Sequence, residues 1–591
     1  MRWEWAATGC LLFIASAVAP LSSNAADKVA PKEAVGLLKK YCLACHGLDA
    51  EVPDFHVLDR ALMTTRRSGD DKHLFLSPGK PDESYLWTRT GVHRDMPPTD
   101  RDVPQPSEAE REKLRLWIEQ GAEFPAAPVR AYLSDAEIIR AIVTDLGRMK
   151  VADRPFVRYF SLVNLHNDPT VSEEDLRITR AGFVKFINSV SRSSNLVFPT
   201  TLDAPEGRKG EGTLFRLDLR DVNWTVDLWK SVVQLYPYGL IQKSSSIAGD
   251  LALMKTLQGT AFFDRVPYVR VDWFLTTASQ GDAYHNLLGL PKTLAELEKQ
   301  LAVDSKRDFS ENRIKRSGFA GSAVSKNFRL VDRFPGGTKY FYRSYDFAKS
   351  HGKAVLVKFP LGPADLAGDK FKEFAFEEDG GELIWSLANG MQGYMIVDKT
   401  GKRIDEAPTN IVRDLGETGG TPAVVNGISC IGCHKHGMRT YVDRIKEWSS
   451  MNGEAQEKVD ALFASKEASD NFLADDRRQF MAALERIMLP YVKDEDGFTL
   501  PIEAYPEPVS FVTRNYRRDL TLKEVAFELG FKAPENMPIR NSASIRSLGL
   551  LPIVDGGKIP RSTWETRADS PTSLFQQTAL ELDLGEPINP N

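Results

Sequence analysis

The sequence predicts a multidomain protein in which a small all-α domain precedes a larger α+β region. Its 591 residues exceed what a single hydrophobic core normally serves. Apolar residues at helical spacing dominate the first part, whereas helix and strand patterns are mixed in the remainder of the chain. We expect the small domain at residues 26–125, a mixed α+β middle region at 130–415 and a mostly helical C-terminal region at 416–591.

Two predicted helices bound the small domain. Residues 32–41 carry apolar side chains at helical spacing and run directly into a cysteine. At the other end, Ser107 and Glu110 form a capping-box pattern ahead of an apolar face that includes Trp117. Gly121 is the expected end of that second helix. This pattern predicts a compact helical domain.

The larger region combines predicted helices with a predicted sheet. Residues 383–387, 391–398 and 402–405 are strand-like and are separated by turn signals, which is typical of an antiparallel meander. A further strand is expected at 354–357. Helical patterns occupy residues 174–190, 226–236, 293–301 and much of 444–488.

Composition narrows the class of protein. Hydrophobic residues make up 42% and charged residues 27% of the chain, which is ordinary for a soluble globular protein. The net charge of −5 is small, and no basic stripe is present. A general nucleic-acid binder is therefore not expected.

The N-terminus has the layout of a signal peptide at residues 1–25. Arg2 is followed by an apolar run at 11–19 and by small residues around Ala25. The alternative is a membrane anchor, but the run is shorter than the roughly 20 residues that span a bilayer. We expect cleavage near Ala25, a periplasmic or otherwise exported protein, and no integral membrane span after the signal is removed.

The cysteines occur in one repeated pattern. Of the five, Cys10 leaves with the predicted signal, and the other four lie in the pentapeptides Cys42-Leu43-Ala44-Cys45-His46 and Cys430-Ile431-Gly432-Cys433-His434. No cysteine remains for a disulfide framework, although an exported protein could form one.

The C-x-x-C-H pattern predicts covalent attachment of haem. Two thiols at this spacing reach the two vinyl groups, and the adjacent imidazole reaches the iron. A thiol redox pair does not need the histidine, and a zinc site needs four converging ligands. We therefore expect two covalently bound c-type haems: haem 1 on Cys42 and Cys45, with His46 as proximal iron ligand, and haem 2 on Cys430 and Cys433, with His434.

Met96 is the expected sixth ligand of haem 1. It stands in Asp95-Met96-Pro97-Pro98, where two prolines stiffen the loop that would hold the thioether at the iron. A methionine ligand raises the haem potential, which suits electron transfer. The competing candidates are His93, His73, His56 and Met63.

The small domain resembles a known family. The segments Cys45-His46-Gly47, Ser77 to Trp87, Met96-Pro97-Pro98 and Leu116 to Ala122 are similar in order and spacing to the planctomycete-type cytochrome c domain. The resemblance implies an all-α class I cytochrome c fold with iron ligation by His46 and Met96. The stretch 379–438 resembles part of large exported bacterial cytochrome proteins, which implies electron transfer.

The sixth ligand of haem 2 is less evident. Met438 and His436 lie too close to His434 in sequence to reach the opposite side of the haem. We favour His285, ahead of Met391 and Met395, and keep His351, His166 and Met451 as further candidates. The remaining alternative is an iron without a sixth protein ligand, which could bind peroxide, oxygen or a small substrate.

A charged strand in the middle region has two interpretations. Alternation along residues 214–221 places Arg216, Asp218 and Arg220 on one face. The face could bind haem propionates, or it could be an exposed surface of ion pairs; the second interpretation is favoured.

Two functions follow from these motifs. The first is an electron carrier between redox protein partners or a respiratory complex. The second is a haem enzyme, peroxidase- or oxidase-like, with catalysis at haem 2 and electrons passed through haem 1. A binding or scaffolding role for the middle region is a weaker third hypothesis.

Overall fold

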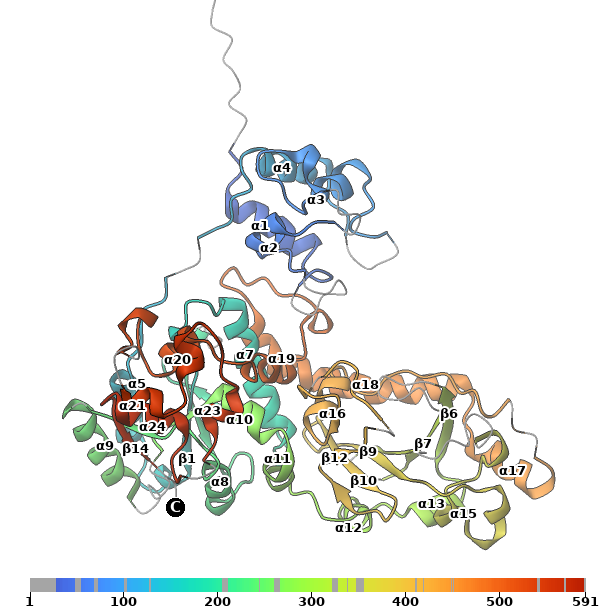
Figure 1. Ribbon diagram of the computed structural model, residues 1–591. Coiled ribbons are helices and arrows are strands. Elements are labelled where there is room, and N and C mark those ends of the chain that lie inside the picture. The colour runs from blue at the N-terminus through green and yellow to red at the C-terminus, as the bar shows by residue number, and fades with distance from the viewer. Residues whose placement is uncertain are drawn as a thin grey trace, which may run out of the picture. The chain divides into compact units, whose positions relative to one another are not determined.

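The computed structural model describes residues 28–47, 55–68, 73–99, 104–126, 129–204, 211–243, 245–259, 266–320, 328–336, 339–346, 356–409, 412–417, 419–447, 449, 451–538, 543–567 and 570–588 (Figure 1). The predicted signal peptide lies outside these residues. The chain divides into two compact units, Met1–Pro128 and Val129–Asn591. The multidomain mixture of helices and sheets is thus confirmed.

The first unit is helical. Its elements are α1 (Pro31–Tyr41), α2 (Arg60–Thr65), η1 (Pro81–Glu83), α3 (Tyr85–Trp87), η2 (Thr88–Val92) and α4 (Glu108–Glu119). Helices α1 and α4 pack against each other around buried Leu38, Trp117 and Ile118. The predicted capping box at Ser107 is present and begins α4. Both predicted bounding helices are therefore confirmed.

The second unit contains two main sheets. A four-stranded sheet has the order β2-β3-β1-β5, and a six-stranded antiparallel sheet has the order β11-β10-β9-β8-β7-β6. The strands are β1 (Val157–Ser161), β2 (Thr200–Thr201), β3 (Leu214–Asp218), β4 (Leu240–Gln242), β5 (Val269–Arg270), β6 (Lys315–Ala320), β7 (Phe328–Phe334), β8 (Phe341–Tyr345), β9 (Gly380–Ser386), β10 (Gln392–Asp398), β11 (Arg403–Ile404), β12 (Glu406–Ala407), β13 (Val424–Val425) and β14 (Gly585–Pro587).

Helices surround these sheets. They are α5 (Asp135–Arg148), α6 (Val163–Asn167), α7 (Glu173–Ser189), α8 (Val226–Val233), α9 (Ser245–Gln258), α10 (Val271–Ala278), α11 (Gly281–Leu288), α12 (Leu294–Leu301), α13 (Ser305–Ser310), α15 (Ala364–Phe371), α16 (Ile428–Cys433), α17 (Gly453–Leu462), α18 (Lys466–Val492), α19 (Pro508–Tyr516), α20 (Leu522–Glu528), α21 (Ala543–Ser547), α22 (Leu551–Val554), α23 (Arg561–Glu565) and α24 (Leu574–Glu581).

The predicted meander is confirmed, but one predicted strand is wrong. Strands β9, β10 and β11 pair in antiparallel order across the two expected turns. Leu356 and Val357 instead lie in a helical turn, and residues 354–355 lie outside the described chain. A short apolar run fits a buried helix as well as a strand, so periodicity could not separate them.

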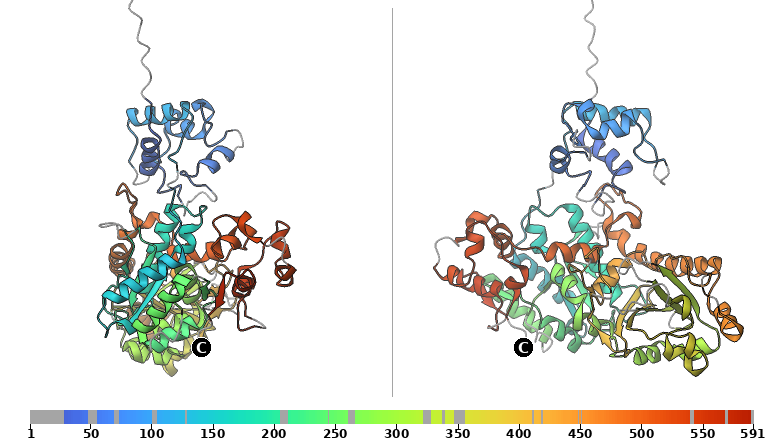
Figure 2. Two further views of the ribbon diagram at one scale, coloured as in Figure 1. Left: turned by 90° about the vertical axis from the view of Figure 1, so that its left-hand side faces the viewer. Right: turned by 45° about the vertical axis from the view of Figure 1, so that its right-hand side comes forward.

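The six-stranded sheet presents two different faces. Cross-strand register and alternation place Val331, Ser344, Tyr342 and Ile384 on one face. On that face α18 contributes Asp476, which binds both Arg333 and Tyr342. Figures 1 and 2 show α18 running along one side of this sheet. This face, called face A below, lines the same cavity as the second C-x-x-C-H motif.

The opposite face carries its own buried charge. Arg316 and Asp332 are fully buried and form a bidentate ion pair. The Arg316 Nε lies 2.7 Å from Asp332 Oδ1, and Nη2 lies 2.6 Å from Oδ2. The Arg316 guanidinium also lies over the ring of Phe309 from α13. Helices α13 and α15 pack together, and Asp365 of α15 lies 3.8 Å from Arg343 on this face.

A helical layer supports the second motif from the other side. Helix α7 is buried along most of its length and packs against α18 and α19. Helix α19 in turn packs against α10 and against α16, which carries the two cysteines. Lys185 of α7 forms a buried 2.7 Å ion pair with Glu507, whose carboxylate also caps α19. The helix that carries the motif is therefore supported by packed helices.

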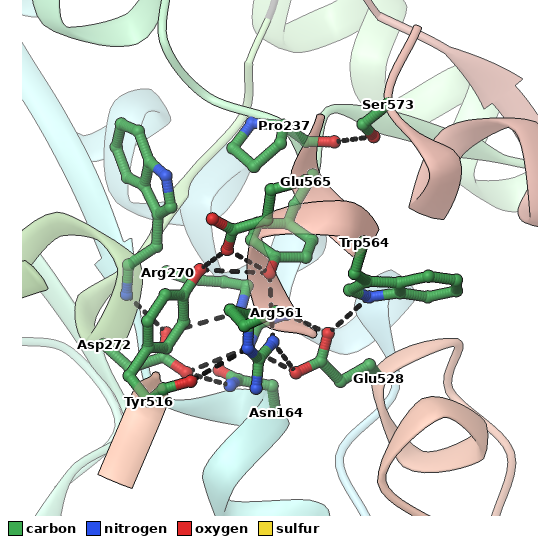
Figure 3. Close-up of polar contacts among 12 residues, drawn as sticks. Asn164, Pro237, Arg270, Asp272, Tyr516, Glu528, Arg561, Trp564, Glu565 and Ser573 are labelled. Atoms are coloured by element: carbon green, nitrogen blue, oxygen red, sulfur yellow. Dashed lines mark hydrogen bonds and ion pairs between the residues drawn. The ribbon is translucent and has the colours of Figure 1, made fainter. Parts of the chain in front are cut away.

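A buried polar network attaches the C-terminal segment to this helical layer (Figure 3). Arg270 binds Asp272 at 2.9 Å and also pairs with Glu528 of α20. Arg561 of α23 binds the same glutamate, and the indole of Trp564 donates to it at 2.9 Å. Burial opposes ionisation of Glu528, but the two guanidinium groups outweigh it and lower its pKa to about 2. Glu528 is therefore an anion that joins three elements.

Removing the Glu528 carboxylate should destabilise the second unit strongly. Glu528→Ala leaves two buried arginines without this partner, which typically costs about 3–5 kcal/mol of unfolding free energy. Because the folded-state pKa is lowered, the stabilisation is present above the ordinary carboxyl pKa of 4.5 and is lost as pH falls toward 2. Denaturant unfolding followed by circular dichroism at several pH values measures both effects.

The matched control is Glu311→Ala, which removes an exposed carboxylate paired with Arg307. It should change stability much less than Glu528→Ala. Equal losses in the two variants, or a Glu528→Ala deficit that does not shrink between pH 4.5 and 2, would contradict the assignment.

Candidate haem sites

Helix α16 orients the second motif. It begins after Gly427, whose φ of 93° is in the left-handed region, and a β-carbon there would lie 2.4 Å from the Ser279 carbonyl oxygen. At its end, the backbone N–H of His434 donates to the Cys430 carbonyl at 2.8 Å. This helical turn brings one thiol and the imidazole to the same side of the chain.

The His434 ring is prepared to bind a metal through Nε2. Its Nδ1 lies 3.2 Å from the Gly437 carbonyl oxygen, which can only accept, so Nδ1 is the donor. Burial lowers the pKa of His434 and keeps the imidazole neutral. A neutral ring with Nδ1 held by a carbonyl leaves the Nε2 lone pair for iron. The ring of Tyr394 lies 5.9 Å away and limits its rotation.

The thiols fit covalent attachment. Cys42, Cys45, Cys430 and Cys433 are all free of disulfides. Burial raises the pKa of Cys42 and of Cys433 to about 12, and it raises that of Cys430 as well. The four thiols are free of disulfides, as thioether formation with vinyl groups requires.

A cavity of about 790 Å³ borders the second motif. This volume lies in the range of sites for cofactors and other small molecules. Face A contributes Phe319, Arg329, Val331, Tyr342, Ser344, Glu382 and Ile384. Helix α16 and the motif contribute Ser429, Cys430, Cys433 and His434, and the segment after the motif contributes Met438, Arg439, Thr440, Tyr441, Val442 and Arg444. Apolar walls, two thiols and an imidazole in one cavity fit a c-type haem.

The cavity also carries charge. Arg329 is 4% exposed and binds Asp346 at 2.5 Å and Glu382 at 3.2 Å. Burial and the neighbouring Glu382 raise the pKa of Asp346 to about 6, although Arg329 opposes the shift. Arg439 and Arg444 line the same cavity from the segment that comes after the motif.

The first motif has the same local geometry. Helix α1 ends immediately before Cys42, and the backbone N–H of His46 donates to the Cys42 carbonyl at 2.9 Å. The His46 ring meets the edge of Phe55 at 5.2 Å, and Phe55 stacks on Phe75 at 4.1 Å. The two motifs therefore present thiol and imidazole in the same way.

Met96 lies in an anchored loop. Arg89 pairs with Asp95 at 2.8 Å, and the Gln105 side-chain amide donates to the Pro97 carbonyl at 2.6 Å. Met96 itself is half-buried, whereas the competing candidate Met63 is fully buried. The loop is thus fixed on both sides of Met96, and its ligation of haem 1 stays a prediction.

His285 does not line the cavity. It lies on α11, fully buried, with its Nε2 3.0 Å from the Asn426 side-chain amide. Burial, with a contribution from Arg403, lowers the pKa of His285 to about 4. The His285 Nε2 accepts a hydrogen bond from Asn426, which is typical of a histidine with a structural role. Ligation of haem 2 by His285 stays a prediction.

The other described candidates for the sixth position of haem 2 are also outside the cavity lining. Met395 faces the side of the sheet opposite Tyr394, and Met391 is buried at the turn between β9 and β10. His166 contacts the Ala131 carbonyl, and His351 lies outside the described residues. Among the described lining residues, His434 is the one histidine and Met438 the one methionine.

Sequence reasoning missed the charged residues of the cavity. Arg329 and Glu382 come together through pairing of β7, β8 and β9, which no local pattern reveals. Arg439 and Arg444 could have been found, because positive charge is dense directly after the motif. Arg216 and Arg220 form ion pairs with Asp145 and with Asp218 and Asp153, as the favoured interpretation of that strand predicted.

Comparison with known proteins identifies the first site. Residues 42–100 match the family model described as planctomycete cytochrome C, so the first unit contains a cytochrome c domain, and a haem-based electron-transfer role follows. The curated proteins contain no match to the chain. The solved structures contain none either. Within the described chain, no helix combines the length and apolar character needed to cross a bilayer.

Replacing His285 separates a structural role from a ligand role. His285→Phe keeps an aromatic ring but removes the acceptor for Asn426, and an unsatisfied buried amide typically costs about 1–3 kcal/mol. His285→Gln retains an acceptor and should recover part of that stability. A purely structural role predicts that both variants keep the optical spectrum that haem 2 has in the parent protein. Conversion of haem 2 to a high-spin spectrum in both would instead establish His285 as its ligand.

Proposed function

We propose that the protein is an exported dihaem c-type cytochrome that carries electrons between redox partners in the periplasm. The observation that carries the proposal is the second motif: two free thiols and an imidazole, with Nδ1 held by Gly437, border a cavity of about 790 Å³. The cytochrome c domain at residues 42–100 supplies the first haem site. A periplasmic dehydrogenase or a respiratory complex is the kind of partner we expect.

Bound haem supplies one-electron chemistry, and the chain determines where that happens. Cys42 and Cys45 hold the first group, and Cys430 and Cys433 hold the second. Hydrogen bonding of the His434 Nδ1 fixes the ring orientation, and such an outer partner increases the basicity of the ligand. Ligation by Met96 would raise the potential of haem 1 and suit it to relay electrons.

The number of haems tests the proposal directly. The full chain, expressed with the cytochrome maturation machinery, should contain two haems that remain attached after denaturation. Cys42→Ala/Cys45→Ala and Cys430→Ala/Cys433→Ala should each lose one haem per chain. Pyridine haemochrome spectra with protein mass spectrometry measure the count, and the same masses report cleavage near Ala25. If Cys430→Ala/Cys433→Ala keeps as many haems per chain as the parent protein, the dihaem assignment is refuted.

The composition of the cavity favours a second candidate function, a peroxidase- or oxidase-like haem enzyme with catalysis at haem 2. The described lining offers Met438 as its one methionine, four residues after His434, and no second histidine. An iron without a sixth protein ligand would be open to a small substrate.

Binding of carbon monoxide and cyanide decides between the two functions. The electron carrier predicts two six-coordinate, low-spin haems that bind these ligands slowly. The enzyme predicts rapid binding at haem 2 alone. Met96→Ala serves as the positive control, because removal of the expected ligand should open haem 1 as well. Rapid binding at haem 2 with turnover abolished in His434→Ala would replace the electron-carrier proposal with the enzyme.

A further inference from the structure

The three arginines that line the haem 2 cavity differ in their partners. Arg329 is buried and lies between two carboxylates, those of Asp346 and Glu382. Arg439 and Arg444 are exposed and line the cavity as well. Among the described residues, neither of these two has an ion-pair partner. The charge of Arg329 is therefore balanced by neighbouring carboxylates, whereas Arg439 and Arg444 have no described carboxylate partner.

The segment that carries the two arginines is held in place. The backbone N–H of Arg444 donates to the Gly318 carbonyl at 2.7 Å, and the Asp443 carboxylate accepts from the Gly318 N–H at 2.7 Å. Tyr441 stacks on Phe319 with ring centres 5.0 Å apart. These contacts fix residues 441–444 along β6, so the position of Arg444 is set by the backbone.

The two sides of the cavity differ in charge. On face A, the carboxylates of Asp346 and Glu382 outnumber the guanidinium group of Arg329 that they bind. The segment after the motif contributes Arg439 and Arg444 to the cavity lining. An anionic group would accordingly be attracted at the side of Arg439 and Arg444.

We propose that Arg439 and Arg444 bind the two propionate carboxylates of haem 2. The inference rests on the proposed function, because it assumes a haem on Cys430 and Cys433. Haem has two carboxylates on the edge opposite the vinyl groups, and the cavity has two guanidinium groups that pair with no described carboxylate. The planar guanidinium group of arginine is well suited to bidentate pairing with a carboxylate. Cys430 and Cys433 would hold the vinyl edge, and the exposed Arg439 and Arg444 would bind the carboxylates.

This arrangement affects how easily haem 2 accepts an electron. Positive charge beside the propionates offsets the negative charge that reduction adds. Replacing both arginines with neutral glutamine should therefore make reduction less favourable by about tenfold, which equals about 59 mV for a one-electron couple. Each single replacement should produce a smaller shift in the same direction.

The test uses the full chain with haem 1 removed by Cys42→Ala/Cys45→Ala, so that haem 2 is observed alone. Arg439→Gln, Arg444→Gln and the double variant are titrated by spectroelectrochemistry, with haem content measured in parallel. Arg439→Lys/Arg444→Lys keeps the charge and should recover most of the potential. Arg478→Gln, which alters an exposed arginine paired with Asp475 outside the cavity lining, is the matched control and should cause no shift.

The outcomes separate the two proposals. The two single glutamine variants could instead lose haem 2. This result would also support propionate binding if the lysine double variant and Arg478→Gln both retain haem 2. A double glutamine variant that keeps haem 2 at the potential of Arg478→Gln overturns this inference and leaves the dihaem cytochrome intact. Absence of haem from the parent, which retains Cys430 and Cys433, overturns the proposed function instead.

Discussion

Pairing of buried charge is the constraint on which the second unit depends. A buried ion without a partner is strongly destabilising, so each such group ties together the elements that supply its partners. The pair Lys185–Glu507 joins α7 to α19, and α19 supports the helix that carries Cys430 and Cys433. Glu528 joins α20, α23 and the start of α10 in the same way. Much of the architecture around the motif follows from these contacts.

The candidate haem 2 site arises where two such layers meet. Asp476 of α18 is bound by Arg333 and Tyr342 on face A, and that face forms one wall of the cavity. The helical layer of α19 and α16 presents the cysteines and His434. Neither layer alone encloses the volume. The site therefore depends on long-range packing to a degree that the first cytochrome domain, with its local helical framework, does not.

Local sequence signals predict many elements correctly. Capping boxes at Ser107 and Thr293 begin helices as expected, because a cap is satisfied within one turn of chain. The meander from β9 to β11 is also predictable, since its turns are short and carry clear signals. The strand expected at 354–357 is wrong, because a short apolar run does not distinguish a strand from a buried helix. The contact of His285 with Asn426 joins residues that are far apart in sequence, so no local pattern could predict it.

The sequence by itself determined the chemistry: two C-x-x-C-H motifs, an Asp95-Met96-Pro97-Pro98 loop and no other cysteine in the predicted mature chain. These are contiguous, so spacing alone carries the information. Only the tertiary structure decided which charged groups surround the second motif. Arg329 binds two carboxylates there, whereas Arg439 and Arg444 pair with no described carboxylate. Arg329 and its carboxylates meet through sheet pairing of strands up to about fifty residues apart. Strand register, and not local periodicity, sets which side chains share that wall.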